Sequence, residues 1–119
     1  RLEAIVALDA PTLASPLPAA DGTLVVLTRA ATLWSVRPAT RAAEPIAEFG
    51  GAARGSLAKA DGRLYVGLLD GRLIALNANG TELWRTRLDD SIVAPVTAVG
   101  GTVFVPLLRG DVVRLEVAR

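Results

Sequence analysis

The sequence predicts an all-β protein built from β-propeller blades, as three four-stranded antiparallel repeats with a period of about 40 residues. A glycine-led, β-rich run recurs at a nearly constant spacing, first at Gly22, then at Gly62 and again at Gly101. Pairs of turn-forming residues divide each repeat into short apolar strands. A fixed period of this length, filled with such strands, indicates a repeat architecture.

The repeated residues form two separate runs that keep the same register. The first run reads Asp-Gly-Thr-Leu-Val-Val from residue 21, Asp-Gly-Arg-Leu-Tyr-Val from residue 61 and Gly-Gly-Thr-Val-Phe-Val from residue 100. The second run is Leu-Trp-Ser-Val from residue 33, Leu-Ile-Ala-Leu from residue 73 and Val-Val-Arg-Leu from residue 112. Both runs therefore return with the same period, which shortens by one position before the third repeat.

The central repeat shows the order of the elements within one unit. We expect strands at Ser56–Ala60, Arg63–Leu68, Arg72–Asn77 and Glu82–Leu88. Asp-Gly, Asp-Gly and Asn-Gly pairs separate them, and these residue types tolerate the positive φ of tight turns. Four strands joined in this way make an antiparallel meander. The two inner strands are apolar on both faces, as expected for a sheet stacked between neighbouring sheets.

Two segments resemble helices by composition but are predicted to be strands. Arg41–Glu48 carries Pro45 in its middle and aligns with a strand of the next repeat. Ser91–Leu108 contains no charged residue and is long enough to span a membrane. Pro95 and Pro106 would break such a helix, so we predict a strand–turn–strand segment and no transmembrane segment.

The chain, residues 1–119, is predicted to be a single propeller-type repeat domain with blade boundaries near 10–49, 50–89 and 90–119. Leu2–Leu8 aligns with the fourth strand of a repeat and could complete the last blade. Three blades are too few to close a ring, because propellers have at least about four. We therefore expect the chain to be part of a longer propeller or half of a six-bladed assembly, for example a head-to-tail dimer.

The repeats resemble the pyrroloquinoline-quinone-type (PQQ-like) propeller repeat. The resemblance is carried by Asp-Gly-Arg-Leu-Tyr-Val-Gly at 61–67, Asp-Gly-Arg-Leu-Ile-Ala-Leu-Asn at 70–77 and Gly-Thr-Glu-Leu-Trp at 80–84. It is good across Ser56–Leu88, fair across Val93–Val117 and degraded across Leu13–Phe49. That family includes quinoprotein alcohol dehydrogenases and the periplasmic propeller lipoprotein of the outer-membrane β-barrel assembly machine. The resemblance implies that Trp84 docks between adjacent blades.

Turn glycines are the other predicted structural residues. Each lies in a connection between predicted strands, where a tight turn requires positive φ. They are Gly22, Gly62, Gly71, Gly80, Gly101 and Gly110.

The residue types present exclude several kinds of chemistry. The chain has no His and no Cys, so it cannot form a zinc site from the usual ligands, a haem ligand set or a His-based triad. A net charge of +1, from 13 basic and 12 acidic side chains, provides no field for nucleic acid. We therefore predict no enzymatic activity, no cofactor and no metal. The alternative is a fragment of a PQQ-dependent quinoprotein oxidoreductase, or a propeller domain that senses PQQ or another ligand.

The candidate partner site consists of charged residues in loops. In a propeller, the loops between blades and those joining the second and third strands of a blade lie on the same face. The charged residues assigned to these loops are Asp9, Arg54, Asp70, Asp89, Asp90 and Arg109. With the family resemblance, they favour a non-catalytic scaffold for protein–protein interaction in the bacterial cell envelope, in the periplasm or another extracytoplasmic compartment.

Overall fold

The computed structural model describes residues 8–10, 12, 16–19 and 21–116. These residues form three antiparallel sheets and no helix. The first sheet has the order β1-β2-β3-β4, the second β5-β6-β7-β8, and the third β9-β10-β11. The strands are β1 (Leu17–Pro18), β2 (Leu24–Leu27), β3 (Thr32–Arg37), β4 (Ala42–Glu48), β5 (Ala53–Ala60), β6 (Arg63–Leu68), β7 (Arg72–Asn77), β8 (Glu82–Arg87), β9 (Thr97–Val99), β10 (Thr102–Pro106) and β11 (Val112–Glu116).

The predicted all-β meander is confirmed. Strands β6 and β7 have the predicted bounds, whereas β5 begins at Ala53 because an irregularity in its pairing with β6 extends it towards the preceding loop. The segment around Pro45 is strand β4, at the edge of the first sheet, where a residue without an N–H is tolerated. Of the predicted strand Leu2–Leu8, all but Leu8 lies outside the described residues.

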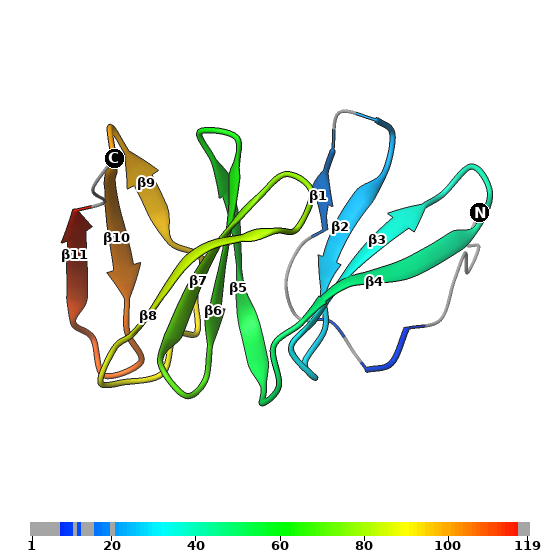
Figure 1. Ribbon diagram of the computed structural model, residues 1–119. Helices are drawn as coiled ribbons and strands as arrows, with labels where there is room; N and C mark the ends of the chain where they lie inside the picture. Colours follow the sequence, from blue (N-terminus) through cyan, green and yellow to red (C-terminus); the bar gives the residue numbers. More distant parts are fainter. Residues whose placement is uncertain (1–7, 11, 13–15, 20, 117–119) are drawn as a thin grey trace.

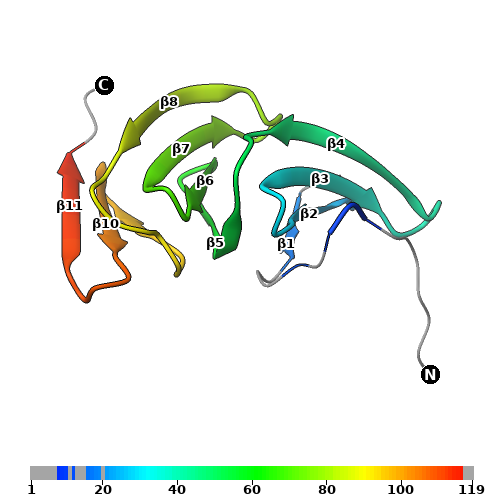
Figure 2. The same ribbon diagram turned by 90° about the horizontal axis from the view of Figure 1, so that it is seen from below.

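The three sheets stand side by side and fan around a shared concave side (Figures 1 and 2). In Figure 2, β1 and β5 line the concave side, while β4 and β8 form the convex side. Within each sheet the strands run between two ends of the molecule. We call the end that holds the β5–β6, β7–β8 and β9–β10 turns the hairpin end. The opposite end, which holds the β6–β7 and β10–β11 connections and the links between sheets, is the loop end (Figure 1).

Two apolar cores lie between the sheets. The core between the first and second sheets, here the first interface, is aliphatic: its buried residues are Val25, Leu27, Ala31, Leu33, Ala53, Leu57, Leu64, Val66, Leu68, Ile74 and Leu76. The core between the second and third sheets, the second interface, contains an aromatic pair at its edge: its buried residues are Tyr65, Leu73, Ala75, Ile92, Val96, Val103, Val105 and Leu107, with Trp84 packed against them.

The middle sheet contributes to both interfaces because alternate side chains point to opposite faces of a strand. On β6, Leu64 and Val66 belong to the first interface and Tyr65 to the second. On β7, Ile74 belongs to the first and Leu73 to the second. This explains why the inner strands are apolar on both faces. Each fully buried aliphatic side chain contributes roughly 1.5–3 kcal/mol.

The two outer faces of the fan differ in exposure. On the third sheet, Phe104 and Val112 are 36% and 64% exposed, at the positions that Tyr65 and Leu73 occupy one repeat earlier. On the first sheet, Val26 is only 6% exposed. Among the described residues, large apolar side chains are therefore exposed on the third sheet and not on the first.

Candidate functional site

Arg109, in the loop between β10 and β11, is the centre of a charged cluster at the loop end. Its backbone N–H donates to Asp90 Oδ2 at 2.8 Å, and its Nη2 donates to Asp89 Oδ1 at 2.9 Å. Its Nε donates to Asp111 Oδ2 at 2.7 Å. The structure therefore brings together three of the predicted residues, Asp89, Asp90 and Arg109, and adds Asp111.

Asp70, in the loop between β6 and β7, is the centre of a second charged cluster at the same end. Its Oδ2 accepts from Arg72 Nε at 2.8 Å and from Arg87 Nη2 at 3.1 Å. Arg72 Nη1 also donates to Phe49 O at 2.7 Å, in the connection between the first two sheets. Arg72 and Arg87 were not predicted as site residues. A signal existed for Arg72, because it flanks the same Asp-Gly turn as Asp70.

Backbone hydrogen bonds hold these loops in place. Leu69 N donates to Ala52 O at 2.9 Å, and Leu108 N donates to Ser91 O at 3.0 Å, at equivalent positions of successive repeats. Ser91 Oγ also donates to Leu69 O and so joins the second and third sheets. Gly71 lies so close to Leu88 O that an added Cβ would come within 2.3 Å of it. The loop end therefore presents its charges on a fixed backbone.

Asp9 and Arg54 lie apart from both clusters. Asp9 accepts a hydrogen bond from Trp34 Nε1 at 3.1 Å, beside the first sheet. Arg54 is exposed but belongs to strand β5, so its assignment to a loop was wrong. The bulged start of β5, which sequence patterns do not reveal, moved this residue into the sheet.

Hydrogen bonding shifts the ionisation of both clusters. Backbone N–H groups of Arg109 and then Ser91 lower the pKa of Asp90 from its ordinary value. Desolvation acts to raise the pKa of Asp70, but hydrogen bonds from Arg72 outweigh it and the pKa is lowered. The side chains of Asp89 and Asp111 raise the pKa of Arg109. Asp70, Asp90 and Arg109 keep their charges at neutral pH, and solvent screens their exposed ion pairs, which therefore add little to stability. The loop end thus offers fixed charges for recognition.

The predicted structural residues lie as follows. Trp84 is partly buried on β8, packs on the second interface and has its ring centroid 6.2 Å from that of Tyr65. Its Nε1 is buried without a hydrogen-bond partner among the described residues. All the predicted turn glycines have positive φ: 84° at Gly22, 75° at Gly62, 92° at Gly71, 87° at Gly80, 87° at Gly101 and 102° at Gly110.

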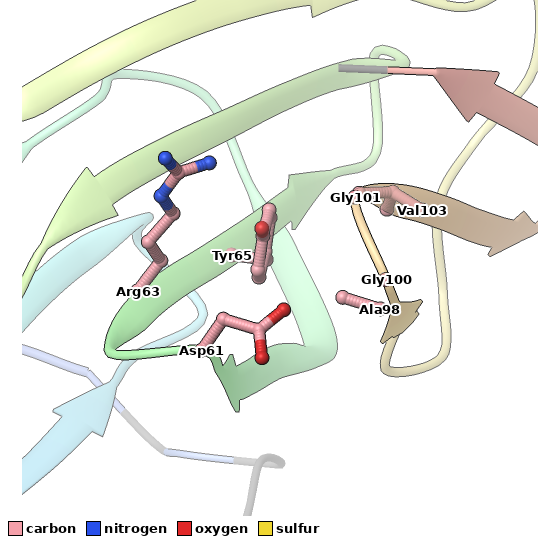
Figure 3. A pocket seen from close by; sticks show the side chains of 7 residues that line it. All are labelled: Asp61, Arg63, Tyr65, Ala98, Gly100, Gly101 and Val103. Atoms are coloured by element: carbon pink, nitrogen blue, oxygen red, sulfur yellow. The ribbon is translucent and has the colours of Figure 1, made fainter. Parts of the chain in front are cut away.

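A cleft of about 550 Å³ opens at the hairpin end, between the second and third sheets (Figure 3). Tyr65 lies between Arg63 on one side and Ala98 on the other. The cleft was not predicted, because its two walls come from different repeats and no local pattern marks it. The lining residues are Asp61, Arg63, Tyr65, Ala98, Gly100, Gly101 and Val103.

Neither region holds an evident centre for metal chemistry. Within the described part of the chain, no group of three or more Asp or Glu side chains is placed to hold a metal ion. Among the same residues, no helix is long and apolar enough to cross a membrane.

Comparison with solved structures places the fold among propeller proteins. A europium-containing methanol dehydrogenase matches with a TM-score of 0.68 and 22% identity, over 86% of this chain and 22% of its own. BamB from Moraxella catarrhalis matches with a TM-score of 0.68 and 20% identity, over 92% of this chain and 34% of its own. The chain thus spans about a third or less of either protein. The computationally designed Ika4 protein matches with a TM-score of 0.65 and 15% identity, over 99% of this chain and 100% of its own.

The sequence itself gives the more specific relationship. No curated protein matches it. Residues 20–118, however, match the family described as outer membrane protein assembly factor BamB, and this match covers strands β2 to β11. The PQQ-like repeat identified from the sequence is thereby confirmed. The chain belongs to the family of the outer membrane protein assembly factor BamB.

Proposed function

We propose that this chain is a non-catalytic scaffold that binds another protein through its loop end, in the periplasm or an equivalent compartment of the bacterial envelope. The observation that carries the proposal is the pair of charged clusters around Asp70 and Arg109, held on hydrogen-bonded loops of neighbouring sheets. Fixed complementary charges favour specific recognition and fast association. Membership of the BamB family supports a partner from outer-membrane protein assembly.

Site-specific photo-crosslinking in bacterial cells tests this role. A photoreactive amino acid at Leu108, exposed at the loop end, should form a discrete crosslink to an envelope protein. The matched control carries the photoreactive amino acid at Asn79, which is exposed in the β7–β8 turn at the hairpin end. This variant should not form that crosslink. Adding Arg109→Glu should abolish the Leu108 product. Equal products from both ends, or none from Leu108, would contradict the proposal.

A fragment of a quinoprotein oxidoreductase is the second candidate, favoured by the fold shared with methanol dehydrogenase. The donor groups present do not fit PQQ with its calcium ion, because the described residues contain no cluster of three or more carboxylates placed to hold a metal ion. Incubation with PQQ and calcium, followed by desalting, distinguishes the two functions. We expect no retained chromophore absorbance. Stoichiometric retention would replace the scaffold proposal with the oxidoreductase or a PQQ-sensing domain.

Self-association is the other part of the proposal. The open face of the third sheet carries Phe104 and Val112 where the second sheet, at Tyr65 and Leu73, is covered by a neighbour. We infer that a sheet from a second copy covers this face. In a head-to-tail dimer it would be the first sheet, and the contact between Asp9 and Trp34 would be displaced.

Light scattering measures this association directly. The mass in solution should exceed the 12.4 kDa of one chain. Phe104→Glu should shift the population towards monomer, whereas Leu83→Glu, at an exposed position on β8, should not. A well-folded wild-type monomer of 12.4 kDa would refute the association.

A further inference from the structure

The hairpin-end cleft lies where the chain departs from its own repeat. Asp21 and Asp61 are equivalent residues, one repeat apart. Asp21 accepts from Thr23 Oγ1 at 2.6 Å and Thr23 N at 3.2 Å. Arg63 stands at the position of Thr23, and neither Asp61 nor Arg63 has a side-chain partner among the described residues. The second repeat therefore presents two opposite charges that the first repeat does not.

The opposite wall of the cleft, from the third repeat, has smaller side chains than the equivalent positions of the second repeat. At the first interface, Lys59 Nζ reaches across to Pro18 O at 3.4 Å. Its equivalent in the third repeat is Ala98, and the equivalent of Asp61 there is Gly100. These two small residues cannot bridge the gap between the sheets. The cleft stays open because of them, and its volume of about 550 Å³ lies within the range of ligand sites.

The charged wall is formed by the β5–β6 turn and the start of β6. Arg63 and Tyr65 are alternate residues of β6, so they share one face of the strand at an interval of roughly 6.6 Å. Asp61 precedes them in the β5–β6 turn, with a φ of 53°. Tyr65 is 3% exposed and closes the inner end of the cleft. Figure 3 shows the Asp61 carboxylate on the side that faces Ala98. The wall therefore presents an acid, a base and an aromatic ring.

An extended peptide has the spacing of Arg63 and Tyr65 between side chains on one face, and the next side chain on that face would lie towards Asp61 in the turn. We propose that the cleft binds a short extended peptide that presents a basic, an acidic and an apolar side chain at alternate positions. The basic group pairs with Asp61, the acidic group pairs with Arg63, and the apolar group packs on Tyr65 and Ala98. This site lies at the end opposite the loop-end clusters and does not depend on the scaffold role proposed for them.

Binding is tested with four acetylated, amidated pentapeptides, read by isothermal titration calorimetry and by the fluorescence of Trp84 next to Tyr65. Lys-Ser-Glu-Ser-Phe and Phe-Ser-Glu-Ser-Lys carry the matching order for the two chain directions. Glu-Ser-Lys-Ser-Phe and Phe-Ser-Lys-Ser-Glu exchange the charges. At least one matching peptide should bind about tenfold more tightly than its exchanged partner. Equal affinity within each pair, or no binding at millimolar concentration, would overturn the proposal.

The chain itself provides the variants that close the cleft. Ala98→Lys with Gly100→Asp introduces the side chains that the second repeat has at the equivalent positions, Lys59 and Asp61. The φ of Gly100 is 56°, that of Asp61 is 53°, and an added Cβ at Gly100 meets no atom within 4 Å. This double variant should keep its melting temperature and lose peptide binding.

Two further variants complete the test. Arg63→Thr should also weaken binding, because the new hydroxyl can donate to Asp61 as Thr23 does to Asp21. Lys59→Ala, the control at the first interface, should leave binding unchanged. Wild-type affinity in the folded double variant at positions 98 and 100 would show that the peptide binds elsewhere.

Discussion

The first and second interfaces are built from the same repeat, yet the larger residue of one equivalent pair comes from opposite sheets in the two interfaces. At the first interface, Leu27 of the first sheet and Ala53 of the second belong to one core. The equivalent residues at the second interface are Gly67 and Ile92. A Cβ added to Gly67 would lie 2.3 Å from Ile92 Cγ2, so the isoleucine fills the space that a larger residue would need. Large and small residues have changed places across the interface.

Charges show the same exchange at the loop end. The second repeat has Asp70 and Arg72 where the third has Arg109 and Asp111. Arg72 donates to backbone carbonyls in the glycine-rich link between the first two sheets. Arg109 instead donates to a side chain, Asp89, in the link between the second and third. The combined size and the combined charge of paired positions are thus similar in successive repeats, although the individual residues differ. The hairpin-end cleft is the place where the compensation is missing.

Loss of an aromatic ring should break the second interface while leaving the first intact. Trp84→Ala removes a ring that packs on the second core, and we expect a loss of about 3–5 kcal/mol in the free energy of unfolding. Trp84→Phe is the matched control, because it keeps most of the packing and removes an Nε1 that has no hydrogen-bond partner in the described part of the chain. Urea denaturation measures both. An alanine variant as stable as the phenylalanine variant would contradict the role of this ring.

Exchange of the bulky residue across the second interface tests the compensation itself. Gly67→Leu alone places atoms too close to Ile92 and Ser56, and overpacking of this kind costs about 3 kcal/mol. The added Ile92→Ala should recover much of that loss, since the pair then matches Leu27 and Ala53 at the first interface. A double-mutant cycle by urea denaturation gives the coupling energy. Additive effects would show that the two sites pack independently.

Removal of Arg72 should destabilise the first interface at the loop end by less than the two substitutions at the second interface. Arg72→Ala removes two hydrogen bonds to the carbonyls of Phe49 and Gly50, and we expect a loss of about 1–2 kcal/mol. Arg114→Ala, on the exposed strand β11, removes only an ion pair with Glu116 and should change stability by less than about 0.5 kcal/mol. Thermal unfolding of both variants decides whether Arg72 is structural. Equal shifts would assign it to the surface alone.

Much of this fold could be predicted from sequence because its determinants are local. The Asp-Gly and Asn-Gly turns define the bounds of β6 and β7 without reference to the rest of the chain. Blade geometry led us to expect Asp89, Asp90 and Arg109 on one face of the molecule with Asp9, Arg54 and Asp70, but it did not predict the contacts among them. Arg54 was misplaced because a bulge depends on pairing with β6. The cleft was missed because it arises where Ala98 and Gly100 face Asp61 across an interface, a relationship between repeats.

Lowering the pH should have the smallest of the expected effects on stability. It should act on the link between the second and third sheets, which uses a carboxylate that can be protonated, and not on the link between the first two sheets, which uses backbone carbonyls. Hydrogen bonds from Arg109 N and Ser91 N lower the pKa of Asp90 in the folded protein. A lowered pKa stabilises the fold at pH values above the unfolded pKa of about 3.9, and this contribution is lost as the pH falls through the folded pKa. Asp90→Asn keeps the size of the side chain but cannot titrate.

The melting temperature of the wild type should therefore fall more steeply than that of Asp90→Asn between about pH 5 and pH 2. Part of the slope will remain in the variant, because hydrogen bonds from Arg72 also lower the pKa of Asp70 against the effect of its desolvation. Adding Asp70→Asn should flatten the profile further. Parallel profiles for the wild type and the Asp90 variant would show that the second link holds Arg109 without help from this carboxylate.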